Sequence, residues 1–238
     1  MRGRIAVGAL LLLGGMTPLA HADEAGVRQA LQGRFPHMTI ESVAPAPFAG
    51  LYEVVLDGEI VYTDEKAEYF FAGSIYDIRT LPPRNLTQDN SGRMVVNALA
   101  SARDSAIKRV KGDGKRILYT FEDPNCGYCK RFRATTLAAM DNVTVYTFMY
   151  NILSPDSFTK SQNIWCSADR NKAWDDWMLN GKAAAAAPNG CTSPNDKVLA
   201  LGQKMSINGT PAIFFADGSR IAGAVDQRTL EAKFATIK

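Results

Sequence analysis

The sequence predicts a small α+β domain, then a connecting helix, then an α/β domain with a helical insertion. Three observations lead to this prediction. The first half has a helix pattern followed by a hairpin pattern, and a long helical stripe follows it. The second half alternates strand and helix patterns around a close pair of cysteines. All four cysteines lie in that half, which suggests that the two parts have different roles.

The first 22 residues have the features of an export signal. Arg2 and Arg4 form a short cationic start, and residues 5–16 are an apolar stretch too short to span a bilayer as a helix. Ala20-His21-Ala22 then supplies the small-x-small cleavage site. We therefore predict a secretory signal peptide over residues 1–22; the alternative is an uncleaved anchor.

The net charge limits the classes of binding partner that the sequence suggests. The chain has 27 Lys and Arg against 24 Asp and Glu, and two of the basic residues lie in the signal, so the mature chain carries a formal charge of +1. A near-neutral balance indicates neither a nucleic acid nor an anionic membrane as a partner. No later segment approaches 18 uninterrupted apolar residues, so we expect a soluble mature protein.

Residues 23–84 form the predicted α+β domain. Val27, Leu31 and Phe35 recur with the spacing of an amphipathic helix. Residues 51–56 and 59–63 flank Asp57-Gly58, a strong tight-turn signal that predicts a hairpin, and residues 69–72 supply a third strand. A domain of this size is marginal alone, and self-association is one remedy.

The linker region covers residues 85–112. A stripe of apolar residues predicts a helix from Ser91 to Val110, which could be a free-standing connector. Five cations surround its end, namely Lys108, Arg109, Lys111, Lys115 and Arg116. They indicate a solvated helix end rather than a basic binding patch, because cations suit the C-terminal end of a helix dipole.

Residues 113–238 carry the pattern of a thioredoxin fold. Residues 117–121 predict a strand, residues 126–140 a helix and residues 143–150 a second strand. After a polar and helical insertion from about residue 157 to 205 come strands at 212–215 and 220–223 and a final helix at 227–237. A βαβ unit followed by a ββα unit is the thioredoxin fold.

The motif Cys126-Gly127-Tyr128-Cys129 lies between the first strand and the first helix of this domain. A C-x-x-C beside a strand–helix unit is typical of a thioredoxin-like redox site. Cys126 begins the helix, where unpaired N–H groups favour a thiolate, so we assign it as the attacking cysteine. Cys129, one turn later, is the resolving thiol that releases a mixed disulfide.

Half of a zinc site is the structural alternative for this motif. Zinc sites usually supply a second close pair of ligands. Here Cys166 and Cys191 are 25 positions apart, and His37 is the only histidine after the signal. The sequence therefore favours redox chemistry and predicts no metal and no cofactor.

Charged residues flank the motif on both sides. Lys130, Arg131 and Arg133 could support a thiolate, but a solvated basic face is the favoured interpretation. Glu122 and Asp123 could relay a proton to Cys129. Because Pro124 follows them and suggests a loop, we expect solvated loop carboxylates.

Two further features lie outside the motif. Cys166 and Cys191 bracket the insertion, and a structural disulfide worth about 3–4 kcal/mol in the chain-entropy model is favoured over a second shuttle pair. Thr210-Pro211 precedes the strand at residues 212–215. On base rates alone its peptide bond is expected to be trans.

Together, the export signal, the C-G-Y-C motif at residues 126–129 and Gly209-Thr210-Pro211 resemble the bacterial periplasmic DsbC/DsbG family of disulfide isomerases, and most of all its DsbC branch. Residues 164–173 resemble the family segment that carries the first cysteine of a structural disulfide. Residues 45–50 and 76–77 resemble its N-terminal domain. The resemblance covers essentially the whole mature chain.

The resemblance implies a V-shaped homodimer with cystatin-like N-terminal dimerisation domains, linker-helix arms and thioredoxin-fold domains that face an uncharged cleft. It implies that Cys126 is the nucleophile and Cys129 the resolving thiol. Thr210–Pro211 becomes a cis-proline loop that binds client backbone by strand addition, next to Gly127 and Tyr128 as substrate contacts. Cys166–Cys191 becomes the structural disulfide.

The resemblance also implies a function. We expect a periplasmic isomerase and reductase that acts on misoxidised exported proteins and is recharged by a membrane thiol reductase of the DsbD type. Thr120 replaces the buried acid of thioredoxin, which puts a proton relay in doubt, and Tyr128 replaces the His of strongly oxidising relatives. The alternatives are a cleft-binding chaperone, a DsbG-like reductase of oxidised cysteines and a thiol oxidase.

Overall fold

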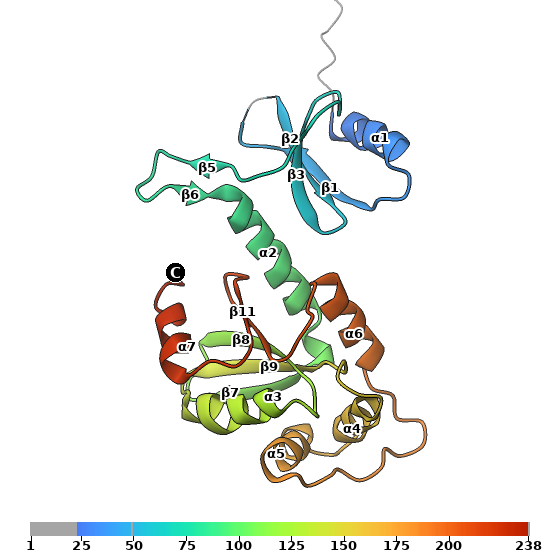
Figure 1. Ribbon diagram of the computed structural model, residues 1–238, viewed down its shortest axis with the longest axis vertical. Helices are drawn as coiled ribbons and strands as arrows, with labels where there is room; N and C mark the ends of the chain where they lie inside the picture. The colour runs from blue at the N-terminus through green and yellow to red at the C-terminus, as the bar shows by residue number, and fades with distance from the viewer. Residues whose placement is uncertain (1–22, 49, 238) are drawn as a thin grey trace, which may run out of the picture. The chain divides into compact units, whose positions relative to one another are not determined.

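The computed structural model of the protein describes residues 23–48 and 50–237, so the predicted signal peptide lies outside the described residues. The chain divides into two compact units, with the boundary between Gly73 and Ser74. Most of their helices and strands are labelled in Figure 1. Within the described residues, no helix has both the length and the apolar character that crossing a membrane requires.

The first unit is one helix on an antiparallel sheet. Its elements are α1 (Glu24–Arg34), β1 (Ile40–Pro45), β2 (Leu51–Leu56), β3 (Glu59–Asp64) and β4 (Phe70–Phe71), with the strands in the order β1-β2-β3-β4. Val27 and Leu31 of α1 are fully buried in a core with Val43 and Val54. The predicted helix and three strands are confirmed, and β1 is an additional strand.

The hairpin between β2 and β3 turns at Asp57 and Gly58. Both residues have positive φ angles, 48° and 85°. A two-residue turn of this kind matches the right-handed twist of the strands it joins, and Asp-Gly tolerates it well. The register that follows pairs Leu56 with Glu59 and Val54 with Val61.

The second unit begins with a short hairpin, β5 (Tyr76–Asp77) and β6 (Arg84–Asn85), followed by α2 (Leu86–Ser101). Asn85 caps α2 by accepting the N–H of Gln88. The helix is not free-standing: Leu99 is fully buried in the core of this unit, and a Cβ on Gly92 would lie 2.3 Å from the carbonyl oxygen of Asp217. Helix α2 therefore packs directly on the turn between β10 and β11.

The predicted end of this helix is wrong. Helix α2 stops at Ser101, a short 3₁₀ turn η1 (Arg103–Ser105) follows, and β7 (Ile107–Lys111) is a strand that pairs with β9. Ile107 is buried whereas Val110 is half exposed, since alternate residues of a strand face opposite sides. The cations of this segment therefore lie on an edge strand, where charge discourages pairing with other chains.

A five-stranded sheet forms the centre of this unit. Besides β7 it contains β8 (Arg116–Glu122), β9 (Val143–Met149), β10 (Ala212–Phe215) and β11 (Arg220–Ala222), in the order β11-β10-β8-β9-β7. Strands β8 and β9 are parallel, and the other pairs are antiparallel. This arrangement confirms the predicted thioredoxin fold.

Helices cover both faces of the sheet (Figure 1). Leu99 of α2 and Val198 of α6 (Asn195–Lys204) pack with Tyr119 on one face. On the other face, α3 (Gly127–Phe132), its continuation as the π-helical turn η2 (Arg133–Leu137) and α7 (Gln227–Phe234) pack around Leu118. The sheet is thus buried on both sides, as a parallel pair of strands requires.

The insertion follows β9. It consists of α4 (Asp156–Trp165), α5 (Arg170–Asn180) and α6, and a disulfide joins Cys166, after α4, to Cys191, before α6, with 6.2 Å between the Cα atoms. The helices α5 and α3 contact each other. The insertion therefore lies next to the helix that carries the C-x-x-C motif.

We predict that Gly92→Ala destabilises the second unit by about 1–3 kcal/mol, because the new Cβ meets rigid backbone of the β10–β11 turn. Urea unfolding followed by circular dichroism measures the change. Gly33→Ala in α1 is the matched control, since its Cβ would meet no atom within 4 Å and alanine favours a helix by about 0.5–1 kcal/mol. An unchanged unfolding midpoint for Gly92→Ala would contradict this prediction, because it would show that the backbone at Asp217 can move away from the new Cβ without a loss of stability.

Candidate active site

The site is built where β8 ends and α3 begins. Cys126 is the N-cap of α3, with an extended backbone (φ −75°, ψ 111°), and its Sγ accepts the N–H of Cys129 at 3.0 Å. Its own N–H donates to the carbonyl of Asp123 at 3.0 Å. A helix N-terminus presents unpaired N–H groups, so the position favours negative charge on the Cys126 sulfur.

Asp123 holds the loop that places Cys126. Its buried carboxylate accepts the N–H groups of Asn125 and Ile152 at 2.8 Å, the N–H of Leu153 at 3.0 Å and the hydroxyl of Ser157 at 2.8 Å. The expected solvated loop carboxylate is therefore wrong for Asp123. Backbone N–H groups from the segment after β9 donate to this carboxylate. They are distant in the sequence, so the residues next to Asp123 do not reveal its burial.

The two thiols of the motif are free, and the structure describes both as buried. In its thiol form, Cys126 donates to the carbonyl oxygen of Thr210 at 3.3 Å. Cys129 lies one turn further along α3 and is fully buried. Cys126 is thus placed between the start of α3 and the loop before β10.

The environment separates the acidities of the two thiols. The hydrogen bond from the Cys129 thiol lowers the pKa of Cys126 to about 6, and the Cys129 N–H lowers it further, whereas burial opposes the shift. Burial raises the pKa of Cys129 above its usual range, and its hydrogen bond to Cys126 raises it further. At neutral pH Cys126 is therefore mostly thiolate, the nucleophilic form, while Cys129 keeps its proton.

The loop opposite the thiols contains Thr210 and Pro211. The Thr210–Pro211 peptide bond is cis, in contrast to the expectation from base rates and in line with what the family resemblance implies. The Thr210 hydroxyl is buried, and among the described residues it has no hydrogen-bond partner. Strand β10 starts immediately after this loop, so the sheet holds the loop against Cys126.

Gly127 and Tyr128 form the exposed side of the motif. The Tyr128 side chain is 70% exposed, and a Cβ on Gly127 would have no atom within 4 Å. A hollow of about 210 Å³ next to Tyr128 is lined by Arg131, Val225 and other residues, and one of about 360 Å³ borders Thr210. One hollow therefore adjoins the motif and the other adjoins the loop that carries Thr210.

Glu122 and Arg133 form a buried ion pair. Glu122 accepts the hydroxyl of Thr120 at 2.7 Å and an Nη1–H of Arg133 at 3.2 Å, and all three side chains are buried. Burial raises the pKa of Glu122, and Arg133 opposes that rise. The expectations of a solvated Glu122 and a solvated Arg133 are wrong, because β8 continues through Glu122 and the loop begins only afterwards.

The other two cations of the motif differ from Arg133. Arg131 is exposed, as the solvated basic face predicts. The Nζ of Lys130 lies 4.7 Å from the ring centre of Trp177, a cation–π contact with the insertion. In the described part of the chain, neither side chain forms a hydrogen bond or ion pair with Cys126 or Cys129.

The other two cysteines are not part of the reactive motif. Cys166 and Cys191 form a disulfide that is separate from the free Cys126 and Cys129. Across residues 23–48 and 50–237, no group of three or more His, Cys, Asp or Glu side chains is placed to hold a metal ion. The arrangement can exchange disulfides through Cys126 and Cys129.

We predict that alkylation of reduced Cys126 by iodoacetamide titrates with a midpoint near pH 6. Mass spectrometry measures the alkylation rate from about pH 4 to about pH 10, a range that includes the pKa values usual for thiols. Replacement of Cys129 by Ala removes the main hydrogen bond and moves the midpoint upwards, whereas Cys129→Ser keeps a donor and moves it less. Identical midpoints in all three proteins would contradict the assigned cause.

Comparison with known proteins agrees with this geometry. Residues 18–88 match the family model described as the disulfide bond isomerase protein N-terminal domain, and residues 103–238 match the thioredoxin-like domain. The crystal structure of a disulfide interchange protein from Neisseria gonorrhoeae superposes with a TM-score of 0.51 at 38% identity, over 56% of this chain and 95% of that one.

Curated relatives match over most of the chain. The probable thiol:disulfide interchange protein DsbC of Bordetella pertussis is 43% identical over 208 residues, which are 87% of this chain and 72% of the relative. The thiol:disulfide interchange protein DsbC of Escherichia coli K12 is 30% identical over 217 residues, 89% of this chain and 87% of the relative. The chain belongs to the DsbC family of thiol:disulfide interchange proteins.

Proposed function

We propose that this protein is a disulfide isomerase and reductase that corrects wrong disulfides in exported proteins through Cys126 and Cys129. The observation that carries the proposal is the division of acidity within the motif. Cys126, with a pKa lowered to about 6, is a thiolate at neutral pH, and Cys129 beside it is protonated and buried. Membership of the DsbC family supports the same conclusion.

The first step is attack on a client. The Cys126 thiolate attacks one sulfur of a client disulfide, the client S–S bond breaks, and a Cys126–client disulfide forms while the other client sulfur leaves as a thiolate. That client thiolate can attack a second disulfide of the same client. When a client thiolate finally attacks the mixed disulfide, Cys126 leaves as a thiolate, and no net oxidation or reduction has occurred.

The second route is reduction. Cys129 loses its proton and attacks the Cys126 sulfur, which forms the Cys126–Cys129 disulfide and releases the client as a thiol. The client gains two electrons and the motif loses two. A dithiol reductase must then return these two electrons to the motif, and we assign that role to a membrane reductase of the DsbD type. We place the reaction in the periplasm, to which the predicted signal peptide at residues 1–22 directs the chain.

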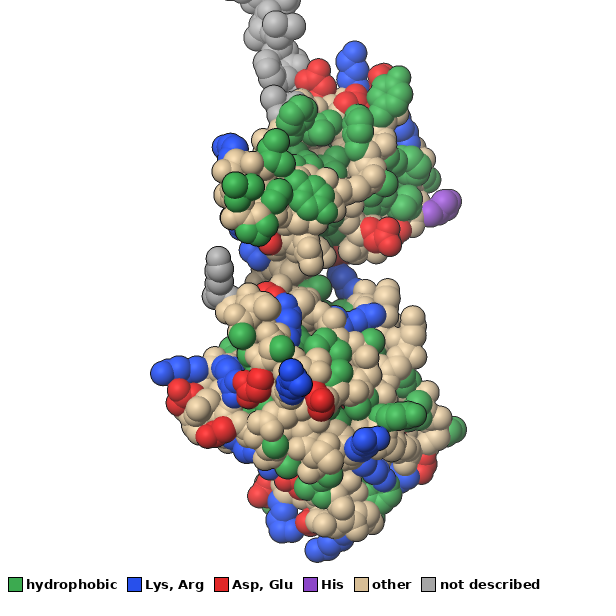
Figure 2. Space-filling model, turned by 60° about the vertical axis from the view of Figure 1, so that its left-hand side comes forward, with side chains coloured by type: hydrophobic (Ala, Val, Ile, Leu, Met, Phe, Trp, Pro, Cys, Tyr) green, Lys and Arg blue, Asp and Glu red, His purple; other side chains and the backbone are tan. Residues whose placement is uncertain are grey.

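We further propose that the first unit pairs with a second copy of the chain. Strand β4 is at an edge of its sheet, and its side chains, Phe70 and Phe71, are exposed together with Tyr69. Figure 2 shows hydrophobic side chains gathered over one face of this unit. Exposed apolar side chains on an unpaired edge strand favour association.

Scrambled ribonuclease provides the test of the isomerase. The wild-type protein should restore ribonuclease activity well above a glutathione control, and Cys126→Ser should restore none above it, because no thiolate attacks the client. Cys129→Ser should accumulate mixed disulfides, visible on non-reducing gels, because no resolving thiol releases them. Prevention of aggregation by Cys126→Ser measures any chaperone activity separately. If Cys126→Ser still unscrambles ribonuclease, the thiol mechanism is wrong.

The dimer has its own test. Phe71→Asp should convert a dimer into a monomer in sedimentation equilibrium, because a charge replaces an exposed apolar side chain at the sheet edge. Leu179→Asp is the matched control, since Leu179 is about as exposed but lies on α5 in the second unit. A dimer that survives Phe71→Asp would place the interface elsewhere.

A further inference from the structure

Glu122 is a buried acid to which the steps above give no role. Its carboxylate is fully buried and is bonded to the hydroxyl of Thr120 and to Arg133. The neighbouring Asp123 is also buried, but its carboxylate accepts three backbone N–H groups and thereby holds a loop. Among the described residues, no backbone N–H donates to the Glu122 carboxylate, so its burial does not serve the same purpose.

Arg133 connects Glu122 to the resolving cysteine. The backbone N–H of Arg133 donates to the carbonyl of Cys129, so the two residues lie one helical turn apart on the same side of the helix. The Arg133 side chain is only 8% exposed. The charge of Arg133 therefore lies in the interior, paired with Glu122, and Arg133 is one helical turn from the buried Cys129.

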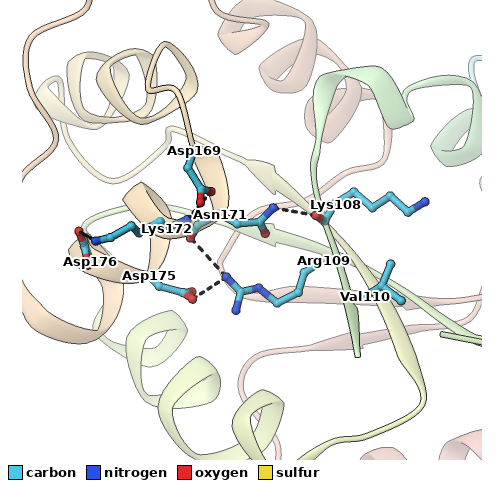
Figure 3. A pocket seen from close by; sticks show the side chains of 8 residues that line it. All are labelled: Lys108, Arg109, Val110, Asp169, Asn171, Lys172, Asp175 and Asp176. Carbon is cyan, nitrogen blue, oxygen red and sulfur yellow. Dashed lines mark hydrogen bonds and ion pairs between the residues drawn. The ribbon is translucent and has the colours of Figure 1, made fainter. Parts of the chain in front are cut away.

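A second acid shares Arg133. Asp175 of α5 accepts from Nη2 of Arg133 at 3.2 Å and also pairs with Arg109 of β7. Figure 3 shows Asp175 directed toward Arg109 at a surface hollow of about 570 Å³. An ion-pair chain, Arg109–Asp175–Arg133–Glu122, thus runs from the solvent side of the insertion to the interior beneath the motif.

The charged and titratable groups around Glu122 come from three elements. Arg133 of η2 stabilises its charged form, Asp175 of α5 opposes that form, and the thiols of Cys126 and Cys129 lie at α3. The negative charge of Glu122 in turn raises the pKa of Cys129, after burial and the Cys126 hydrogen bond. Two negative charges in one buried site disfavour each other.

We propose that the Glu122 carboxylate, held between Thr120 and Arg133, disfavours ionisation of the Cys129 thiol and so lengthens the lifetime of the mixed disulfide between Cys126 and a client. The inference rests on the proposed function and deepens it. Among the described residues, Glu122 forms no hydrogen bond with a reacting sulfur, so it is a positioning residue that acts through its charge.

The consequence concerns the choice between the two routes. In the resolving step Cys129 must give up its proton, attack the Cys126 sulfur and release the client sulfur, which leaves as a thiolate and takes up a proton. A thiol that ionises less often performs this step more slowly. The client then has more time to attack another of its own disulfides, so Glu122 favours isomerisation over reduction.

Glu122→Gln tests the proposal in the full-length protein. Reduced protein is mixed with oxidised glutathione, acid-quenched and analysed by mass spectrometry, which separates the formation of the Cys126–glutathione disulfide from its conversion to Cys126–Cys129. The second step should become faster in Glu122→Gln at pH 7, by about threefold for each unit by which the pKa of Cys129 falls, because a more acidic thiol is more ionised but less nucleophilic.

The matched control is Glu231→Gln. Glu231 lies on α7 and pairs with Arg116, so the same chemical change at an ion pair outside the Glu122 chain should leave the second step unchanged. Glu122→Asp, which keeps the charge, should keep the slow step. The ratio of insulin reduction to ribonuclease unscrambling should rise in Glu122→Gln alone.

Two results would overturn the proposal. A slower second step in Glu122→Gln would show that Glu122 accepts the Cys129 proton, and an unchanged step would show that its charge has no influence. If Glu122→Gln does not fold, Asp175→Asn decides, because it leaves the buried pair in place and lowers the pKa of Glu122. The inflection that Glu122 causes in the pH profile of the second step should then move to lower pH; an unmoved or absent inflection overturns the proposal.

Failure of the proposed function would be visible separately. The glutathione reaction needs only the two thiols and no isomerase activity. A protein that fails with scrambled ribonuclease but shows the faster second step in Glu122→Gln would retain the role of Glu122 and lose the isomerase assignment. The reverse pattern would retain the isomerase and remove the role of Glu122.

Discussion

The chemistry of this protein depends on one contact, the hydrogen bond from the Cys129 N–H to the sulfur of Cys126 at the first turn of α3. It places Cys126 where helix N–H groups stabilise a thiolate, and it brings Cys129 close enough to exchange a disulfide with it. The hydrogen bond between the two thiols and the burial of Cys129 make their pKa values unequal. Cys126 is nucleophilic at neutral pH, whereas Cys129 is protonated and fully buried.

The thioredoxin fold supplies the precision that this contact needs. Strand β8 ends shortly before Cys126. The segment that follows the parallel strand β9 supplies the N–H groups of Ile152 and Leu153, which donate to the Asp123 carboxylate. Strand β10 starts just after Thr210, whose carbonyl faces the Cys126 sulfur. Because these strands are neighbours in one sheet with helices on both faces, three distant segments of the chain meet at the sulfur with little freedom.

The helical insertion is part of the site and not an appendage. Helix α5 contributes Asp175 to the ion pair with Arg133 and Trp177 to the contact with Lys130. The disulfide between Cys166 and Cys191 closes the loop of this insertion that contains α5. The charges beneath the motif therefore depend on a segment that lies forty and more positions later in the chain.

By itself, the sequence determined the local features: the hairpin at Asp57-Gly58, the order of strands and helices after residue 113, and the C-x-x-C motif with Cys126 at a helix start. Each follows from the conformational preference of neighbouring residues. Only the tertiary structure decided that residues 107–111 are a strand, because their pairing partner β9 lies more than thirty positions away. It also decided that Glu122, Asp123 and Arg133 are buried, since the donors and charges that make their burial tolerable come from β9, the insertion and the loop between them.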